Sequence, residues 1–218
     1  MGIKVMRPHE LYPWMYTGAD SYFFKGLEYA VSKGATVSNW SLGGGYIDES
    51  RRTAYKNVAS NIPEHLMVFA AGNNGVLVTS TRFGCGLDLP NQICVASSTE
   101  GDERSSFSNY GTDLVDVFAP GTRILSSTPN NNYNFFKGTS MAAPHVAGLA
   151  ALIRSMKTMT AVEAKNYILD NVQVKSQYAD FVSTSGLIDA LATVNAVAEG
   201  GNGGKKQLFN SSRKFNNN

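Results

Sequence analysis

The sequence predicts an α/β domain whose mostly parallel β-sheet is covered by helices on both faces. Apolar strands alternate with helical patterns along the first half of the 218-residue chain. These strands are almost continuously apolar, which is typical of parallel strands buried on both faces. The composition is that of one globular domain, with 43% hydrophobic residues, 17% charged residues and 21 Gly.

The predicted elements follow one another without an internal repeat. Strands are expected at residues 3–6, 36–41, 66–71, 93–97, 114–118, 124–127 and 133–136. Helices are expected at residues 20–34, 48–61, 140–155, 160–171 and 187–198. The 140–155 helix is rich in alanine, which predicts burial on every side. Thr160 and Glu163 form a predicted capping box at the start of the 160–171 helix.

One folded unit is predicted for residues 1–199. Residues 200–218 are mainly Gly, Asn, Lys and Ser, a composition that predicts a flexible polar tail. A strand at residues 3–6 would place the first residues inside the sheet, so we expect an N-terminally truncated start. The net charge of +2 gives no electrostatic case for nucleic acid, and no apolar run reaches the roughly 20 residues of a membrane helix.

The run GTSMAAPHVAG at residues 138–148 places Ser140 at the start of an apolar helix, directly after a glycine turn. Backbone N–H groups at a helix start are free, and the helix dipole favours negative charge there. Both effects would help a nucleophilic serine. The alternative is that Ser140 is an ordinary N-cap, which is a common role for serine.

The same eleven residues closely resemble the active-site serine motif of the subtilisin-like proteases, or subtilases. The resemblance extends in order over residues 3–198, through Val68–Asn73, 107–111, 117–121 and 186–190. It implies the C-terminal part of a subtilisin-like catalytic domain and a serine endopeptidase with Ser140 as nucleophile. In the run that ends in Ala70, Ala71, Gly72 and Asn73, it implies that Asn73 completes the oxyanion hole with the Ser140 N–H.

The resemblance also implies a groove for an extended peptide substrate. Its walls would be Ser41, Leu42 and Gly43 on one side, and Ala70, Ala71, Gly72 and the 83–86 loop on the other. The residues that line this groove are small or apolar. We therefore expect a preference for an uncharged, largely hydrophobic substrate side chain on the N-terminal side of the cleaved bond. The implied partner is a protein or peptide substrate, and we expect a monomer.

The triad motifs of the family are missing from this sequence. The family carries its Asp and His upstream of the serine in Asp-Thr/Ser-Gly and Gly-His-Gly-Thr-His stretches, and neither occurs here. We expect the three histidines present, His9, His65 and His145, to be structural or solvated. Without its base a serine is a weak nucleophile, so we expect this chain alone to be nearly inactive. A non-catalytic module that binds peptides is the alternative function.

Cys85 and Cys94 suit neither a zinc site nor a CxxC redox motif. We expect them to form a disulfide, because the resembled family is mostly secreted, and two buried free thiols are the alternative. The sequon at Asn39 is expected to be buried in a strand, whereas Asn210 in the tail could carry a glycan in a secreted product. We expect no cofactor in this chain and assign no metal ligand. Calcium would belong to the full-length protein.

Overall fold

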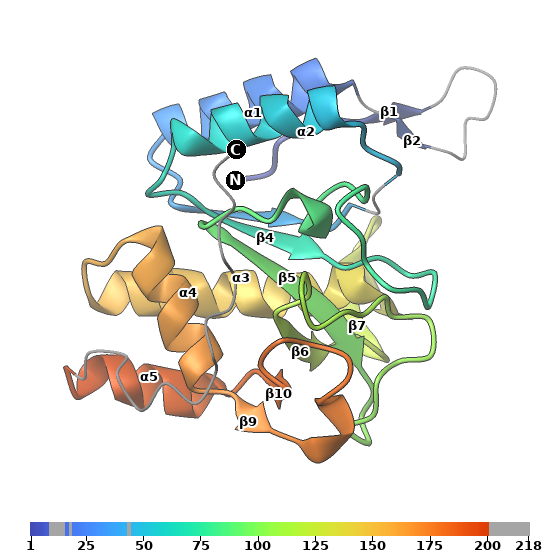
Figure 1. The fold of residues 1–218 in the computed structure, drawn as a ribbon, viewed down its shortest axis with the longest axis vertical. Coiled ribbons are helices and arrows are strands. Elements are labelled where there is room, and N and C mark those ends of the chain that lie inside the picture. Colours follow the sequence, from blue (N-terminus) through green and yellow to red (C-terminus); the bar gives the residue numbers. More distant parts are fainter. Residues whose placement is uncertain (9–15, 18, 43–44, 201–218) are drawn as a thin grey trace.

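The computed structural model describes residues 1–8, 16–17, 19–42 and 45–200. Its centre is a six-stranded sheet in the order β3-β4-β5-β6-β10-β9 (Figure 1). Every neighbouring pair is parallel except β10 with β9, which confirms the predicted sheet. The strands are β3 (Val37–Trp40), β4 (Leu66–Ala70), β5 (Gln92–Ser98), β6 (Val117–Pro120), β9 (Gln173–Val174) and β10 (Gly186–Leu187).

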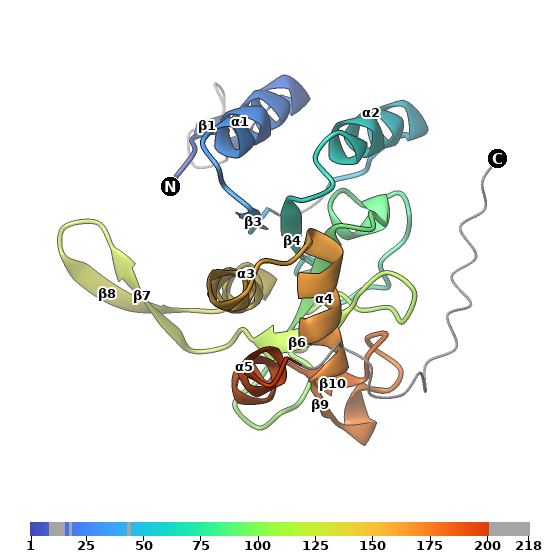
Figure 2. The ribbon, with the colours of Figure 1, turned by 90° about the vertical axis from the view of Figure 1, so that its left-hand side faces the viewer.

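Helices cover both faces of the sheet, as predicted (Figure 2). In β4, Met67 and Phe69 face a core shared with two of the helices, whereas Leu66, Val68 and Ala70 face a second core with the others. This alternation is the period of two that a strand imposes on its side chains. The first face carries α1 (Asp20–Ser32) and α2 (Glu49–Ser60), and the second carries α3 (Thr139–Met156), α4 (Ala161–Asp170) and α5 (Ala190–Ala198).

Two small antiparallel pairs lie outside the main sheet. β1 (Arg7–Pro8) pairs with β2 (Tyr16–Thr17), and β7 (Ile124–Thr128) pairs with β8 (Asn132–Phe136). The β7–β8 hairpin projects from the body of the molecule (Figure 2), and every residue of β8 is exposed. The two remaining short elements are the 3-10 turns η1 (Cys85–Leu87) and η2 (Ser176–Tyr178).

The prediction of a strand at residues 3–6 is wrong. Residues 1–6 form no regular element, and Ile3 and Val5 instead pack against α1 at Gly26, where an added Cβ would lie 2.7 Å from Val5 Cγ1. A strand needs a neighbour that completes its hydrogen bonds. Residues 1–6 pair with no strand of the sheet, and a cavity of about 490 Å³ is lined by this segment and β3.

Two helix predictions need correction. The last helix begins at Ala190 instead of Leu187, because Leu187 belongs to β10 and pairs with Phe118 of β6. Helix α3 is buried on one side only. Its other side exposes Pro144, His145, Gly148, Ala151 and Leu152, because no described element covers it.

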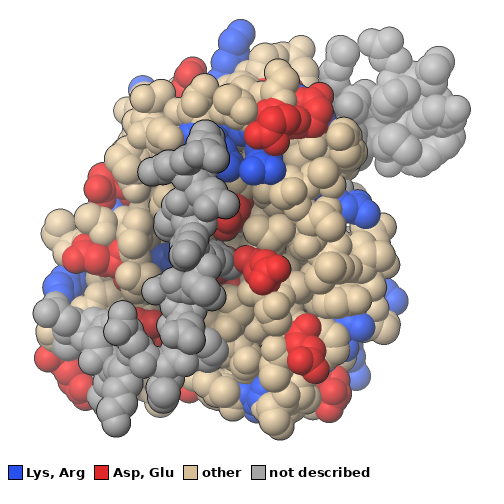
Figure 3. Space-filling view, viewed as in Figure 1, with Lys and Arg blue, Asp and Glu red and all other residues tan. Residues whose placement is uncertain are grey.

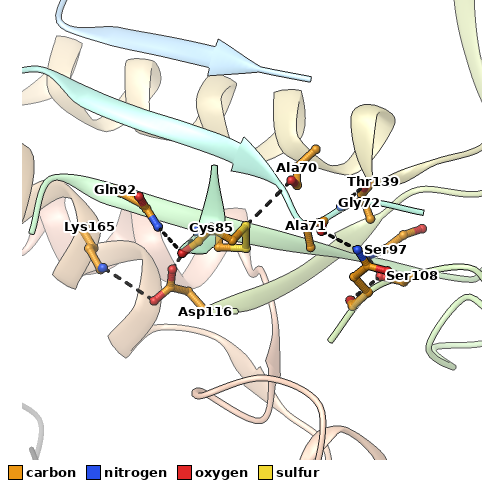
Figure 4. The surroundings of a disulfide bond; sticks show 12 residues. Ala70, Ala71, Gly72, Cys85, Gln92, Ser97, Ser108, Asp116, Thr139 and Lys165 are labelled. Atoms are coloured by element: carbon orange, nitrogen blue, oxygen red, sulfur yellow. Dashed lines mark hydrogen bonds and ion pairs between the residues drawn. A yellow bond between two sulfur atoms is a disulfide. The ribbon is translucent and has the colours of Figure 1, made fainter. Parts of the chain in front are cut away.

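The structure joins Cys85 of η1 to Cys94 of β5 in a disulfide (Figure 4). Both residues are fully buried, and their Cα atoms lie 5.3 Å apart. The Cys85 Sγ lies 3.8 Å from the Ala70 carbonyl oxygen, and the Gln92 side chain donates to the Cys85 carbonyl at 3.1 Å. The bond therefore fixes the 83–86 loop against the ends of β4 and β5.

Replacing both cysteines by alanine is expected to lower the free energy of unfolding by roughly 2–3 kcal/mol. This is the loop-entropy effect of a cross-link between residues nine positions apart in the sequence. Chemical denaturation of the double variant measures it. Dithiothreitol should lower the midpoint of the wild type by a similar amount and leave the variant unchanged; equal midpoints for variant and oxidised wild type would contradict this.

Candidate active site

Ser140 lies in the first turn of α3, where the backbone makes a sharp entry into the helix. The helix begins at Thr139, and the residue before it, Gly138, has φ +148°, a value that strongly favours glycine. The Gly138 N–H donates to the Gly121 carbonyl at 2.8 Å, which fixes the turn. Ser140 is partly exposed at the positive end of the α3 dipole, as the sequence predicts.

Asn73 follows β4 and is held against the same turn. Its Oδ1 accepts hydrogen bonds from the Thr139 N–H at 2.9 Å and from the Thr139 hydroxyl at 3.0 Å. Because a backbone N–H can only donate, these bonds fix which end of the carboxamide carries oxygen. The exposed Asn73 therefore has its Nδ2 group left as a donor, with no protein acceptor within the described residues.

Thr139 connects β4 to α3, and its role was not predicted from the sequence. It is fully buried, and its hydroxyl accepts the Gly72 N–H at 3.0 Å while donating to Asn73. One side chain thus holds both Gly72 and Asn73 next to Ser140. No local pattern distinguishes this threonine from any other residue at a helix start.

Asn109 supports the turn after β4 and was also missed as a site residue. Its Nδ2 donates to the Ala71 carbonyl at 2.9 Å, and its Oδ1 accepts the N–H groups of Asn74 and Val76 at 3.0 and 3.2 Å. Gly72 has φ +102°, and a Cβ there would lie 2.5 Å from the Asn109 Nδ2. The Gly72–Asn73 turn is therefore built around Asn109.

The predicted wall at Ser41 lies against Ser140. The Ser41 hydroxyl donates to the Ser140 carbonyl at 2.7 Å, and the Ser140 Oγ is 3.4 Å from the Ser41 carbonyl. Leu42 is partly buried, and Gly43 lies outside the described residues. Asn39 donates to the Ser41 hydroxyl at 2.9 Å and is exposed, so the expectation that its sequon is buried is wrong.

The other predicted wall combines Ala70–Gly72 with the 83–86 loop. Ala70 and Ala71 are buried, and Phe83 lies edge-on to Phe69 at 6.1 Å and to Tyr55 at 5.0 Å. The disulfide fixes this loop beside β4. The structure thus brings Ser41, Asn73 and Ser140 together, while their roles as catalytic and substrate-binding residues stay predictions.

The two described histidines do not hydrogen-bond Ser140. The Nδ1 atom of His145 lies 2.8 Å from the Met141 carbonyl, on the exposed side of α3. His65 is buried beside Ala35 and Ser38. His9 lies outside the described residues. The part of the chain that is described therefore places no imidazole in contact with the candidate nucleophile.

No metal-binding cluster of three or more His, Cys, Asp or Glu side chains occurs among the described residues. In that same part of the chain, no helix has the length and apolar character needed to cross a membrane. On the face in Figure 3, acidic and basic side chains are interspersed among neutral ones. Neither charge dominates the part of that face that is drawn in colour.

Comparison with known proteins decides the family. A family model described as the Subtilase family matches residues 16–205. The chain belongs to the subtilase family. Subtilisin from Bacillus pumilus is 37% identical to this subtilase over 179 residues, which cover 81% of the chain and 62% of the relative. Subtilisin amylosacchariticus from Bacillus subtilis subsp. amylosacchariticus is 41% identical over 141 residues, which cover 64% of the chain and 36% of the relative.

A solved structure confirms the fold of this subtilase. The prenylagaramide maturation protease PagA superposes with a TM-score of 0.69 at 24% identity, covering 84% of this chain and 69% of that one. The segments of this chain that match the two subtilisins span only 36% and 62% of those relatives' length. Family and fold are shown, and the resemblance read from the 138–148 motif is confirmed.

The stability of this subtilase is expected to fall as the pH is lowered below about 6.5. Burial lowers the pKa of His65, with Arg154 acting in the same direction and the Ala35 carbonyl opposing. The unfolded chain therefore binds a proton at a higher pH than the folded chain does, so stability rises with pH between the two pKa values. Urea midpoints at pH 7.5 and 5.5 measure this loss. In His65→Gln the loss should be smaller, and an equal loss would rule out His65 as its source.

Proposed function

We propose that Ser140 is the nucleophile of a serine endopeptidase that cleaves peptide bonds through an acyl-enzyme intermediate. The observation that carries the proposal is the pair of hydrogen bonds from Thr139 to Asn73, which place an exposed amide beside the residue at the helix start. In a chain of the subtilase family, this is the arrangement expected of a nucleophile and an oxyanion donor. The secretory pathway is the proposed location, in line with the subtilisins it resembles.

The substrate we propose is an extended, uncharged stretch of protein. β3 is an edge strand of the sheet, and the chain continues from it through Ser41 and Leu42 past Ser140. A peptide laid along the chain at Ser41 and Leu42, beyond the end of β3, can add as a further strand. The opposite wall of the groove contains the buried Ala70 and Ala71 and the ring of Phe83. This apolar wall favours apolar substrate side chains over charged ones. Nucleic acid, a membrane and a second copy of the chain are not part of the proposal.

The catalytic base is proposed to come from a polypeptide segment outside these 218 residues. Ser140 contacts no imidazole in the described part of the chain. Within the described residues, one edge of β3 has no partner strand and one side of α3 is uncovered, so both surfaces are available to such a segment. Calcium, if it is used, is likewise proposed for the longer protein.

A non-catalytic peptide-binding module is the second candidate, favoured because no imidazole in the described part of the chain contacts Ser140. Two observations distinguish the endopeptidase from the binding module. One is the transcript sequence upstream of the Met1 codon, and the other is labelling by a fluorophosphonate, a probe that reacts with active serines. The endopeptidase proposal expects an in-frame His and Asp motif upstream of the Met1 codon, and labelling of Ser140 in the protein that carries them. An upstream frame without these motifs, together with an unlabelled natural protein that binds peptides, would establish the binding module instead.

A further inference from the structure

Ser38 and His65 form a hydrogen bond on the face of the sheet opposite α3. Ser38 of β3 lies with its Oγ 2.8 Å from Nε2 of His65, and Nδ1 of His65 lies 2.8 Å from the Ala35 carbonyl oxygen. The Trp40 indole N–H donates to the same Ser38 Oγ at 2.7 Å. Ser38 shares its side of β3 with Trp40, which packs in the core under α1 and α2.

The partners of His65 fix its tautomer. A carbonyl oxygen can only accept, so Nδ1 must carry the proton that reaches Ala35. Burial favours the neutral ring, so Nε2 carries no proton and accepts the hydroxyl hydrogen of Ser38. The ring is thus oriented by one group while it accepts a hydrogen bond from a hydroxyl, which is the arrangement of a serine nucleophile and its general base.

A cavity lies beside this serine. It has a volume of about 490 Å³, within the range of small-molecule sites, and Ser38 is among its lining residues. The rest of the lining is largely apolar and includes Ile3, Val5, Phe23 and Leu27. Ser38 itself is partly exposed, whereas His65 is only 2% exposed, so the base is shielded from water. The volume and the largely apolar lining suit a short apolar acyl group.

We propose that Ser38, activated by His65, is a second nucleophile that accepts the acyl group of small apolar esters. The Ser38 Oγ forms a bond to the carbonyl carbon while its proton passes to Nε2 of His65. The bond between that carbon and the ester oxygen breaks, the oxygen keeps the electron pair, and it takes the proton back from Nε2 of His65 as the alcohol or phenol leaves. The step uses neither Ser140 nor Asn73, so it is independent of the proposed endopeptidase.

The probe is p-nitrophenyl butyrate, applied to the Ser140→Ala variant of the chain. Release of p-nitrophenol and the gain of one butyryl group by intact mass are expected, with peptide mapping placing the group on Ser38. Adding Ser38→Ala should abolish this label. Adding His65→Gln should slow it by about 10²-fold or more, the usual contribution of a general base.

Ser32→Ala is the matched control, because this exposed serine already donates its hydroxyl to the Tyr29 carbonyl at 2.8 Å. It should leave the rate unchanged. Tryptophan fluorescence checks that each variant is folded. If a variant unfolds, mapping on Ser140→Ala alone decides the question. A label on Ser38 supports the proposal, whereas no label, a label only elsewhere, or an unchanged rate in folded His65→Gln overturns it.

Discussion

The 218-residue chain, assayed alone, should hydrolyse peptide substrates about 10⁶-fold more slowly than a form that also carries the family's histidine. In subtilisin, removing the histidine lowers kcat by this order, which corresponds to about 8 kcal/mol of barrier. The reason here is geometric. The Ser140 Oγ lies 3.4 Å from the Ser41 carbonyl, and no described imidazole is placed to remove its proton.

The measurement is kcat on a chromogenic peptide for the chain and for the histidine-bearing protein, each with and without Ser140→Ala. Ser140→Ala should bring the histidine-bearing protein down to the level of the chain and change the chain itself very little. Efficient cleavage by the chain, abolished by Ser140→Ala, would show that the described residues already contain a working base.

Replacing Asn73 by alanine in the histidine-bearing protein should lower kcat by roughly 10²- to 10³-fold and change KM little. This is the size of the loss seen in subtilisin when its oxyanion-hole asparagine is removed. The effect falls on kcat because an oxyanion donor acts on charge that develops only in the transition state. The Asn73 Nδ2 group is free to donate because Thr139 hydrogen-bonds the Asn73 Oδ1 atom and so fixes the orientation of the amide.

Thr139→Ser is the matched control for Asn73. It keeps the hydroxyl that donates to Asn73 and accepts from Gly72, so kcat should stay near that of the parent. Thr139→Val removes this hydroxyl and should lower kcat without touching the substrate. An unchanged kcat in Asn73→Ala would show that Asn73 does not act in the oxyanion hole.

Local chemistry was enough to predict most of the fold. The Asp48 side chain caps α2 by accepting the Arg51 N–H, and Thr160 and Glu163 form the expected capping box of α4. The buried strand β4 consists of apolar residues only, and the centre of β5 is the apolar run Ile93–Ala96. These elements are set by neighbours in the chain, so a single sequence reveals them.

The errors arose where an element depends on distant partners. Residues 3–6 have the composition of a strand but lack a pairing neighbour, and α3 looks buried all round but is covered on one side only. The same holds for the site. The motif around Ser140 revealed the nucleophile candidate, whereas the contributions of Thr139 and Asn109 follow only from contacts between segments far apart in sequence.

A crystal structure with a peptide boronic acid bound tests the placement of the oxyanion hole most directly. The account predicts a bond between boron and the Ser140 Oγ, with one boronate oxygen 2.7–3.1 Å from the Asn73 Nδ2, which is roughly the range of an oxyanion hydrogen bond. The peptide should lie along the chain at Ser41. A boronate bound to Ser140 with its oxygens turned away from Asn73 would contradict the account.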